Sequence, residues 1–170
     1  ISLKIPLICA ISPNDPCFMI KIFDISYLNL VNQFSTIMTN KSKKILSEIS
    51  AGELLDKISI LEIKLEKITD KNNLEEVKKE HKILKETQLS SINIDNNINN
   101  LFDSLKKINL ILWNVEDKLR ICEKNKDFGK NFIELARDVY VNNDKRSKIK
   151  SEINNLLGSN IREIKQYIDY

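Results

Sequence analysis

The sequence INNLFDSLKKINLILWNVEDKLRIC, residues 98–122, carries the most regular apolar pattern of the chain. Its apolar side chains recur at alternating steps of three and four residues: Ile98, Leu101, Leu105, Ile108, Leu112, Val115, Leu119 and Cys122. This spacing aligns them along one side of an α-helix, where they form a seam that packs against another helix. We therefore predict a long helix over residues 97–124, with Cys122 as a small buried residue of its seam.

Weaker versions of the same spacing predict three further helices, over residues 51–69, 73–89 and 131–157. The first is expected to begin with a capping box. In it the Ser50 hydroxyl accepts a hydrogen bond from the Glu53 amide, and the Glu53 carboxylate accepts one from the Ser50 amide. A short segment at 161–168 is expected to pack back on the helices. The predicted fold class is all-α, with antiparallel helical hairpins that form a bundle or a coiled-coil-like assembly.

The composition excludes several classes of protein. The 170 residues include only three Gly and three Pro, which disfavours a turn-rich β-sandwich and a disordered chain. Lys and Arg number 27 against 24 Asp and Glu, so the net charge of +3 gives no electrostatic case for nucleic acid. With three Cys and one His we predict neither a disulfide framework nor a metal site, and no cofactor. Because no nucleotide-binding or hydrolase motif occurs, the sequence leaves open whether the protein is an enzyme.

Residues 1–37 differ in character from the rest of the chain. They contain all three prolines and only four charged residues, and no apolar run approaches the roughly 20 residues of a membrane span. We expect this segment to be a non-native upstream extension or a disordered arm, with Met38 as the true start. Residues 38–170 are then a single helical domain, which we expect in the cytoplasm and not in a membrane.

The predicted helices differ in length, and this predicts a homodimer. At about 1.5 Å per residue, the first two helices are near 27 Å long and the last two are near 42 Å. A short hairpin cannot cover the whole apolar length of a long one. A second copy of the chain is the simplest cover for the excess.

Polar residues interrupt the apolar seam of the last predicted helix, where Asn143, Arg146 and Lys150 stand between Val139 and Ile153. Burying a cation costs several kcal/mol unless it is paired, so we expect partners on the facing helices. The candidate site residues are Arg137, Tyr140, Asn143, Asp144, Arg146 and Lys150, with Trp113, Glu116 and Arg120 from the helix before, and Asp56, Lys57 and Glu62 from the first helix.

Two interpretations of this cluster stay open. Polar residues in a seam fix the register of packed helices at some expense of stability, which is a structural role. Alternatively, Arg137, Arg146 and Lys150 hold a phosphate or carboxylate, oriented by Asn143 and Tyr140. The lone His81 lies on a seam position among charged neighbours, so we interpret it as a half-buried packing residue.

Residues 52–64, GELLDKISILEIK, resemble the opening motif of the bacterial domain-of-unknown-function family 6165. The similarity continues through LWNVEDKLR at 112–120, FIELARDVY at 132–140 and NDKR at 143–146. This resemblance implies a small, stand-alone cytoplasmic protein, and an association with the glycosyltransferases that make surface polysaccharides. It implies no activity.

The function that we expect is a non-catalytic interaction or scaffold module with a protein partner. The alternative is a binding protein or enzyme for a small anionic molecule, which the Arg and Lys cluster would hold. The two differ in one observable feature. A scaffold has a charge cluster that its own neighbours neutralise, whereas a binding protein keeps cationic donors open toward a cavity.

Overall fold

The computed structural model describes residues 44–166. The chain divides into two compact units, residues 1–46 and 47–170. Of the first unit only residues 44–46 are described, and these are exposed and lie outside any helix. The expectations for residues 1–37 and for Met38 therefore fall outside the described residues.

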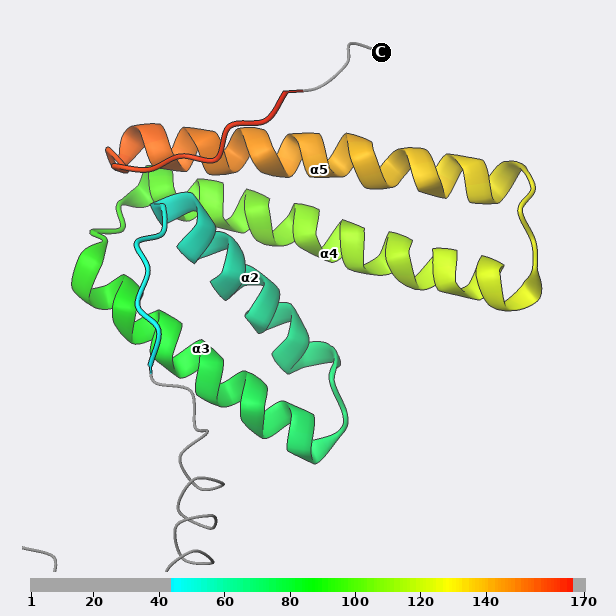
Figure 1. Cartoon of the computed structure of the whole chain (residues 1–170), viewed down its shortest axis with the longest axis horizontal. Helices are drawn as coiled ribbons and strands as arrows, with labels where there is room; N and C mark the ends of the chain where they lie inside the picture. Colours follow the sequence, from blue (N-terminus) through cyan, green and yellow to red (C-terminus); the bar gives the residue numbers. More distant parts are fainter. Residues whose placement is uncertain (1–43, 167–170) are drawn as a thin grey trace, which may run out of the picture. The chain divides into compact units, whose positions relative to one another are not determined.

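Residues 47–166 contain four α-helices, which are α2 (Ala51–Lys67), α3 (Lys71–Ser91), α4 (Asn96–Asn125) and α5 (Lys130–Leu156) (Figure 1). The predicted all-α fold is confirmed. Each helix begins and ends within two residues of the bounds expected from its apolar spacing. The segment that follows α5 has no helical structure in its described part, which ends at residue 166.

The helices form two antiparallel hairpins, α2–α3 and α4–α5, and α2 is the helix that contacts all three others. The helices α4 and α5 pack along each other, and α2 packs against α3, α4 and α5. Figure 1 shows α2 crossing one end of the α4–α5 hairpin obliquely, with α3 beside α2 on the side away from α5. The other end of the α4–α5 hairpin extends beyond α2.

The main core lies where α2 crosses the hairpin. Its buried members are Leu54, Leu55, Ile58, Ile98, Leu105 and Ile153. Leu55 and Ile58 have no exposed surface, because α2 has neighbours on three sides. Each such side chain contributes about 1.5–3 kcal/mol when it is removed from water. In contrast, α3 has only one buried residue, Gln88, which agrees with its sparse apolar pattern.

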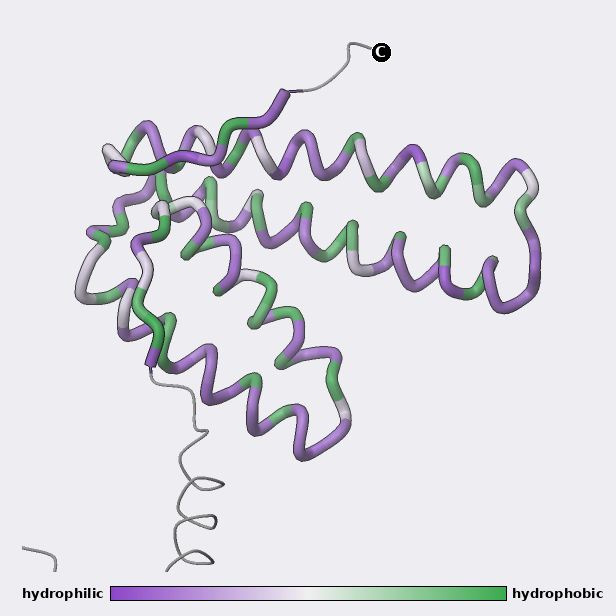
Figure 2. The backbone as a smooth tube through the Cα atoms, in the orientation of Figure 1, coloured by the Kyte–Doolittle hydropathy of each residue, from purple (hydrophilic) through white to green (hydrophobic). Residues whose placement is uncertain are grey.

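A second core lies in the extended part of the α4–α5 hairpin. Val115, Cys122 and Leu135 are buried there, with Leu119, Phe132 and Val139 partly buried around them. In Figure 2 the hydrophobic residues of α4 gather on the turns that face α5. Cys122 is buried, with the Asn131 side-chain amide 3.6 Å from its sulfur, so its predicted packing role agrees with the structure.

Capping hydrogen bonds fix the start of α2 and the end of α5. The Ser50 hydroxyl accepts a hydrogen bond from the Glu53 amide at 3.2 Å, as predicted. The second half of the expected capping box is wrong, because the Glu53 carboxylate binds Lys150 of α5. After α5, Gly158 has a φ of +62°, and the Ser159 amide donates to the Asn154 carbonyl at 2.9 Å. This is a Schellman turn, which sends the chain back along α5 (Figure 1).

Candidate functional site

A buried carboxylate, Asp56 of α2, lies at the centre of the candidate site. Its side chain is 2% exposed and accepts two hydrogen bonds from Arg146 of α5, from Nε to Oδ1 at 2.8 Å and from Nη2 to Oδ2 at 2.5 Å. Asn109 of α4 donates from Nδ2 to Asp56 Oδ1 at 2.9 Å and to Ser59 Oγ at 2.8 Å. We call Asp56, Ser59, Asn109 and Arg146 the Asp56 network. It joins three helices through one carboxylate.

The electrostatics of the Asp56 network explain its residue types. Burying an unpaired carboxylate would destabilise the fold by several kcal/mol. The guanidinium of Arg146 offsets this cost, because its two parallel hydrogen bonds match the geometry of the carboxylate. The hydrogen bond to Asp56 raises the pKa of Arg146 above its ordinary value, although burial alone would lower it. Arg146 is therefore charged at neutral pH.

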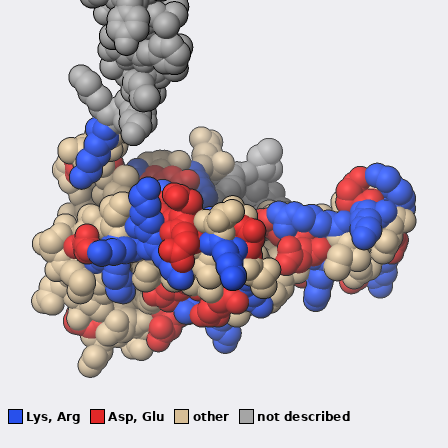
Figure 3. Space-filling model, turned by 90° about the horizontal axis from the view of Figure 1, so that it is seen from below, with Lys and Arg blue, Asp and Glu red and all other residues tan. Residues whose placement is uncertain are grey.

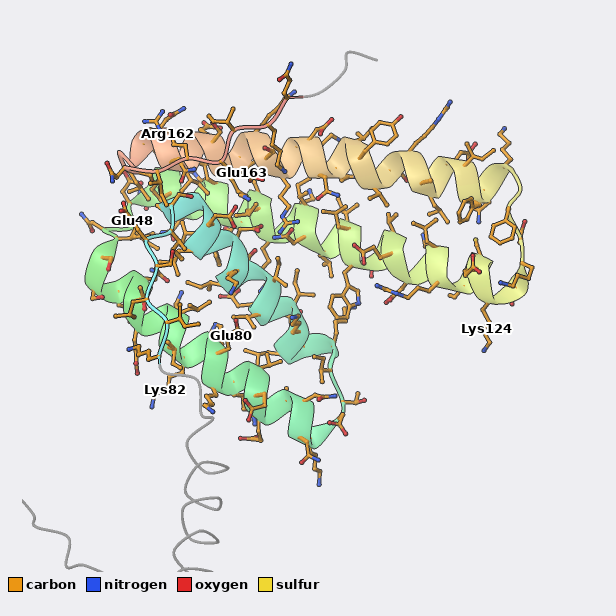
Figure 4. All side chains as sticks on the ribbon, in the orientation of Figure 1. Glu48, Glu80, Lys82, Lys124, Arg162 and Glu163 are labelled. Atoms are coloured by element: carbon orange, nitrogen blue, oxygen red, sulfur yellow. The ribbon has the colours of Figure 1, made fainter. Side chains whose placement is uncertain are left out.

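A second ion cluster lies one helical turn further along α5. The Lys150 side chain is only 9% exposed, and its ammonium group binds Glu53 of α2 and Glu163 Oε2, the latter at 2.9 Å. We call Lys150, Glu53 and Glu163 the Lys150 cluster. Burial lowers the pKa of Lys150, but the hydrogen bonds to the two carboxylates outweigh burial and leave it above the ordinary value. Figure 4 shows Glu163 on the segment that runs back along α5, near the start of α2.

The backbones of α2 and α5 come close together beside the Lys150 cluster. The Gly52 amide donates to Asn154 Oδ1 at 2.7 Å, and the Ala51 amide donates to Ser159 Oγ at 3.1 Å. A Cβ atom on Gly52 would lie 2.6 Å from the Lys150 carbonyl oxygen. Only glycine permits this approach, so the Gly of the GELLDK motif is explained by packing.

The contact between Glu163 and Lys150 predicts a pH-dependent contribution to stability. The hydrogen bond with Lys150 lowers the pKa of Glu163 below its ordinary 4.5, so its contribution is present above that value and is lost as the pH falls through the lowered pKa. Because the Glu163 side chain is 42% exposed, we expect Glu163→Gln to cost about 1 kcal/mol or less at pH 7.

Urea unfolding of the wild type and of Glu163→Gln tests this at two pH values. The difference between the two proteins should be full at pH 7 and should shrink as the pH falls below 4.5 through the lowered pKa of Glu163, because protonation removes the charge that Lys150 binds. Glu152→Gln, which changes an exposed glutamate of α5, is the matched control and should match the wild type. An equal difference for Glu163→Gln at both pH values would contradict the ion pair.

A third polar group lies toward the other end of α2. Lys106 of α4 binds Glu62 at 2.9 Å and Glu66 at 3.2 Å, and these contacts hold the pKa of Lys106 above its ordinary value. His81 Nε2 of α3 is buried without a hydrogen-bond partner and lies 4.0 Å from Glu62 Oε1. The half-buried position predicted for His81 agrees with the structure.

The structure brings together four of the twelve candidate residues: Asp56, Asn143, Arg146 and Lys150. The amide oxygen of Asn143 lies 3.4 Å from Arg146 Nη1. Arg137 lies apart from Arg146: nine residues separate them, about 13 Å along α5, and Arg137 is exposed. Tyr140 and Asp144 each take part in an interaction, so neither side chain is free.

The remaining candidates also lie outside the cluster. Lys57 is exposed and pairs with Glu80 of α3 at 3.4 Å, and Glu62 belongs to the Lys106 contacts. Arg120 pairs with Glu116 and Asp117 on the surface of α4. Trp113 is half-buried on α4, and the cation–π contact within residues 44–166 is instead that of Lys85 over the Phe102 ring, at 5.7 Å.

Sequence reasoning missed five members of the site: Glu53, Ser59, Asn109, Asn154 and Glu163. A signal existed for Asn109, which stands in the apolar run between Ile108 and Leu110. Asn109 also lies four residues after Leu105 and three before Leu112, which places it on the buried side of the predicted helix, and a buried amide needs partners. For Glu163 no such signal existed, because its contact with Lys150 depends on the turn at Gly158, which directs the chain back along α5.

The chemical capacity of the site follows from these pairs. Both cations of the α5 seam are engaged by carboxylates of the chain, and the Asp56 oxygens are held by donors from two helices. Within residues 44–166 no three His, Cys, Asp or Glu side chains lie close enough together to hold a metal ion. In the same residues, no helix has the length and apolarity needed to cross a membrane.

These features define an all-α protein with an internally paired polar core. The model of the Family of unknown function (DUF6165) matches residues 45–169, and the chain belongs to this family. The resemblance to family 6165 is thereby confirmed. No curated protein and no solved structure matches the chain.

Proposed function

We propose that this chain is a non-catalytic interaction module of the bacterial cytoplasm. The observation that carries the proposal is the pairing of Arg146 and Lys150 with carboxylates from α2 and the C-terminal segment. This is the arrangement expected of a scaffold whose charge cluster is neutralised from within. The resemblance suggests the enzymes of surface-polysaccharide synthesis as the class of protein partner.

In this proposal the polar core serves as a brace between α2 and the α4–α5 hairpin. Apolar side chains alone allow two packed helices to slide, because many registers bury similar areas. A single buried bidentate pair allows only one register, since any shift leaves Asp56 without its donors. The brace thus fixes the angle at which the free end of the α4–α5 hairpin projects past α2.

The same geometry weighs against an anion site at this cluster. Arg146 is 27% exposed, but a phosphate that took its donors would have to displace the carboxylate of Asp56. Asp56 would then be left buried and charged beside the phosphate, which costs several kcal/mol. The surface seen in Figure 3 also carries cations and anions intermixed, without a broad patch of one sign.

A titration with inorganic phosphate distinguishes the brace from an anion site. We expect phosphate up to about 10 mM, at matched ionic strength, to raise the melting temperature of wild type and Arg146→Met equally and by about 1 °C or less. A saturable stabilisation of the wild type that Arg146→Met abolishes would contradict the proposal and would favour the anion-binding alternative.

A further inference from the structure

The free end of the α4–α5 hairpin has more apolar surface than its two helices cover. Leu135 of α5 is buried against α4, whereas Ile133 is 52% exposed and Tyr140 is 42% exposed. Ile133, Ala136 and Tyr140 follow one another at steps of three and four residues, so they share a flank of α5. This flank borders the side of α5 that packs on α4.

A groove runs along this part of the hairpin. It is lined by Leu119, Arg120 and Glu123 of α4 and by Phe132, Ala136 and Val139 of α5, and we call it the distal groove. Ala136, the smallest of these residues, leaves room for an incoming side chain. Arg120 and Glu123 supply one charge of each sign at the groove's edge. Both side chains are exposed, and within residues 44–166 they pair only with neighbours in sequence, Arg120 with Glu116 and Asp117 and Glu123 with Lys126. Such exposed pairs are weak enough to exchange for a contact with a second molecule.

We propose that a second copy of this chain occupies the distal groove, so that two hairpins form a four-helix bundle about a two-fold axis. This names the first partner of the interaction module proposed above, and it rests on that role. A two-fold interface requires a ridge and a groove on one surface, because each copy must supply both. The hairpin meets this requirement, since Ile133 and Tyr140 flank the small Ala136 of the groove.

Charge complementarity also favours a second copy over an unrelated helix. A two-fold axis that crosses the groove brings Arg120 of each copy toward Glu123 of the other, so the same two residues give two attractive contacts. A foreign helix would need its own matching pair of charges. The chain's net charge of +3 leaves little repulsion between copies.

The first test measures the mass of the full 170-residue chain by sedimentation equilibrium at about 1–100 µM. We expect twice the 19.7 kDa of one chain for the wild type, and at least a 100-fold weaker dimer for Ala136→Lys, which places a charge in the groove. Ile121→Lys is the matched control, because Ile121 is exposed on the α4 flank away from Leu119 and should leave the dimer intact. Far-ultraviolet circular dichroism verifies that each variant is folded.

Charge exchange gives a second test that does not depend on steric fit. Arg120→Glu and Glu123→Arg should each weaken self-association by about tenfold, because each places like charges opposite one another in its homodimer. An equimolar mixture of the two variants should restore association to near the wild-type strength, since the opposite charges face each other again in the mixed dimer.

The proposal is overturned if the wild type is monomeric across this range, if Ala136→Lys dimerises as well as the wild type, or if the mixture associates no better than the single variants. These outcomes are separate from the phosphate titration. A monomeric wild type that ignores phosphate removes the dimer alone, whereas phosphate binding that requires Arg146 removes the proposed function.

Discussion

Replacing Arg146 by methionine is expected to lower the free energy of unfolding by at least about 3 kcal/mol, measured by urea denaturation of the full chain. Methionine keeps an apolar stem of similar reach, so the loss reports the guanidinium and not a cavity. The carboxylate of Asp56, 2% exposed, would keep the hydrogen bond from Asn109 but would lose the two from Arg146. The expected cost is that of a buried carboxylate that has lost the guanidinium bonded to it.

Arg137→Met is the matched control for this variant. Arg137 lies on the same helix, is exposed and is of the same residue type, so its replacement should change stability by no more than about 0.5 kcal/mol. If Arg146→Met were as stable as the wild type, the protein would retain Arg146 for a purpose other than stability. The brace would then be the wrong account of the Asp56 network.

Gly52→Ala is expected to cost about 2–3 kcal/mol, measured by the same urea denaturation. The added Cβ would lie 2.6 Å from the Lys150 carbonyl oxygen and 2.9 Å from Asn154 Oδ1. The first of these is a backbone atom of a neighbouring helix, so α2 and α5 must move apart to relieve the contact. That movement also stretches the hydrogen bond from the Gly52 amide to Asn154.

Gly129→Ala provides the comparison for the Gly52 variant. Its added Cβ would approach only the Asp127 side chain, at 3.2 Å, and that side chain can turn away. We expect a loss of about 1 kcal/mol or less there, since alanine is a poorer helix cap than glycine. Equal effects at the two glycines would show that α2 and α5 do not meet as closely as described.

Much of the fold was predictable because it rests on local rules. The alternation of three and four residues from Ile98 to Cys122 specifies a helix and its buried side without reference to any partner. Arg146 and Lys150 could be recognised as cations in an apolar seam that need counter-charges. Asp56 was among the expected partners because it is one of the charged residues that stand among the Leu and Ile side chains of the first helix.

The composition of the site was less predictable because it depends on how the helices cross. The oblique crossing of α2 over α4 selects Asn109 and leaves Trp113, one turn along, outside the Asp56 network. The Schellman turn at Gly158 brings Glu163 onto Lys150, a contact that no periodic pattern encodes. Arg137 and Arg146 are on the same helix, but their separation of nine residues places Arg137 about 13 Å along α5 from Arg146 of the Asp56 network.

A double-mutant cycle between Asp56 and Arg146 tests the brace most directly. Asp56→Asn, Arg146→Met and the double variant are compared with the wild type by urea unfolding of the full chain. We expect a coupling free energy of about 2 kcal/mol or more, with the double variant more stable than Arg146→Met, because the neutral amide that replaces the carboxylate no longer needs a counter-charge. Effects that add to within about 0.5 kcal/mol would contradict the account, since Arg146 would then not be held in place to neutralise Asp56.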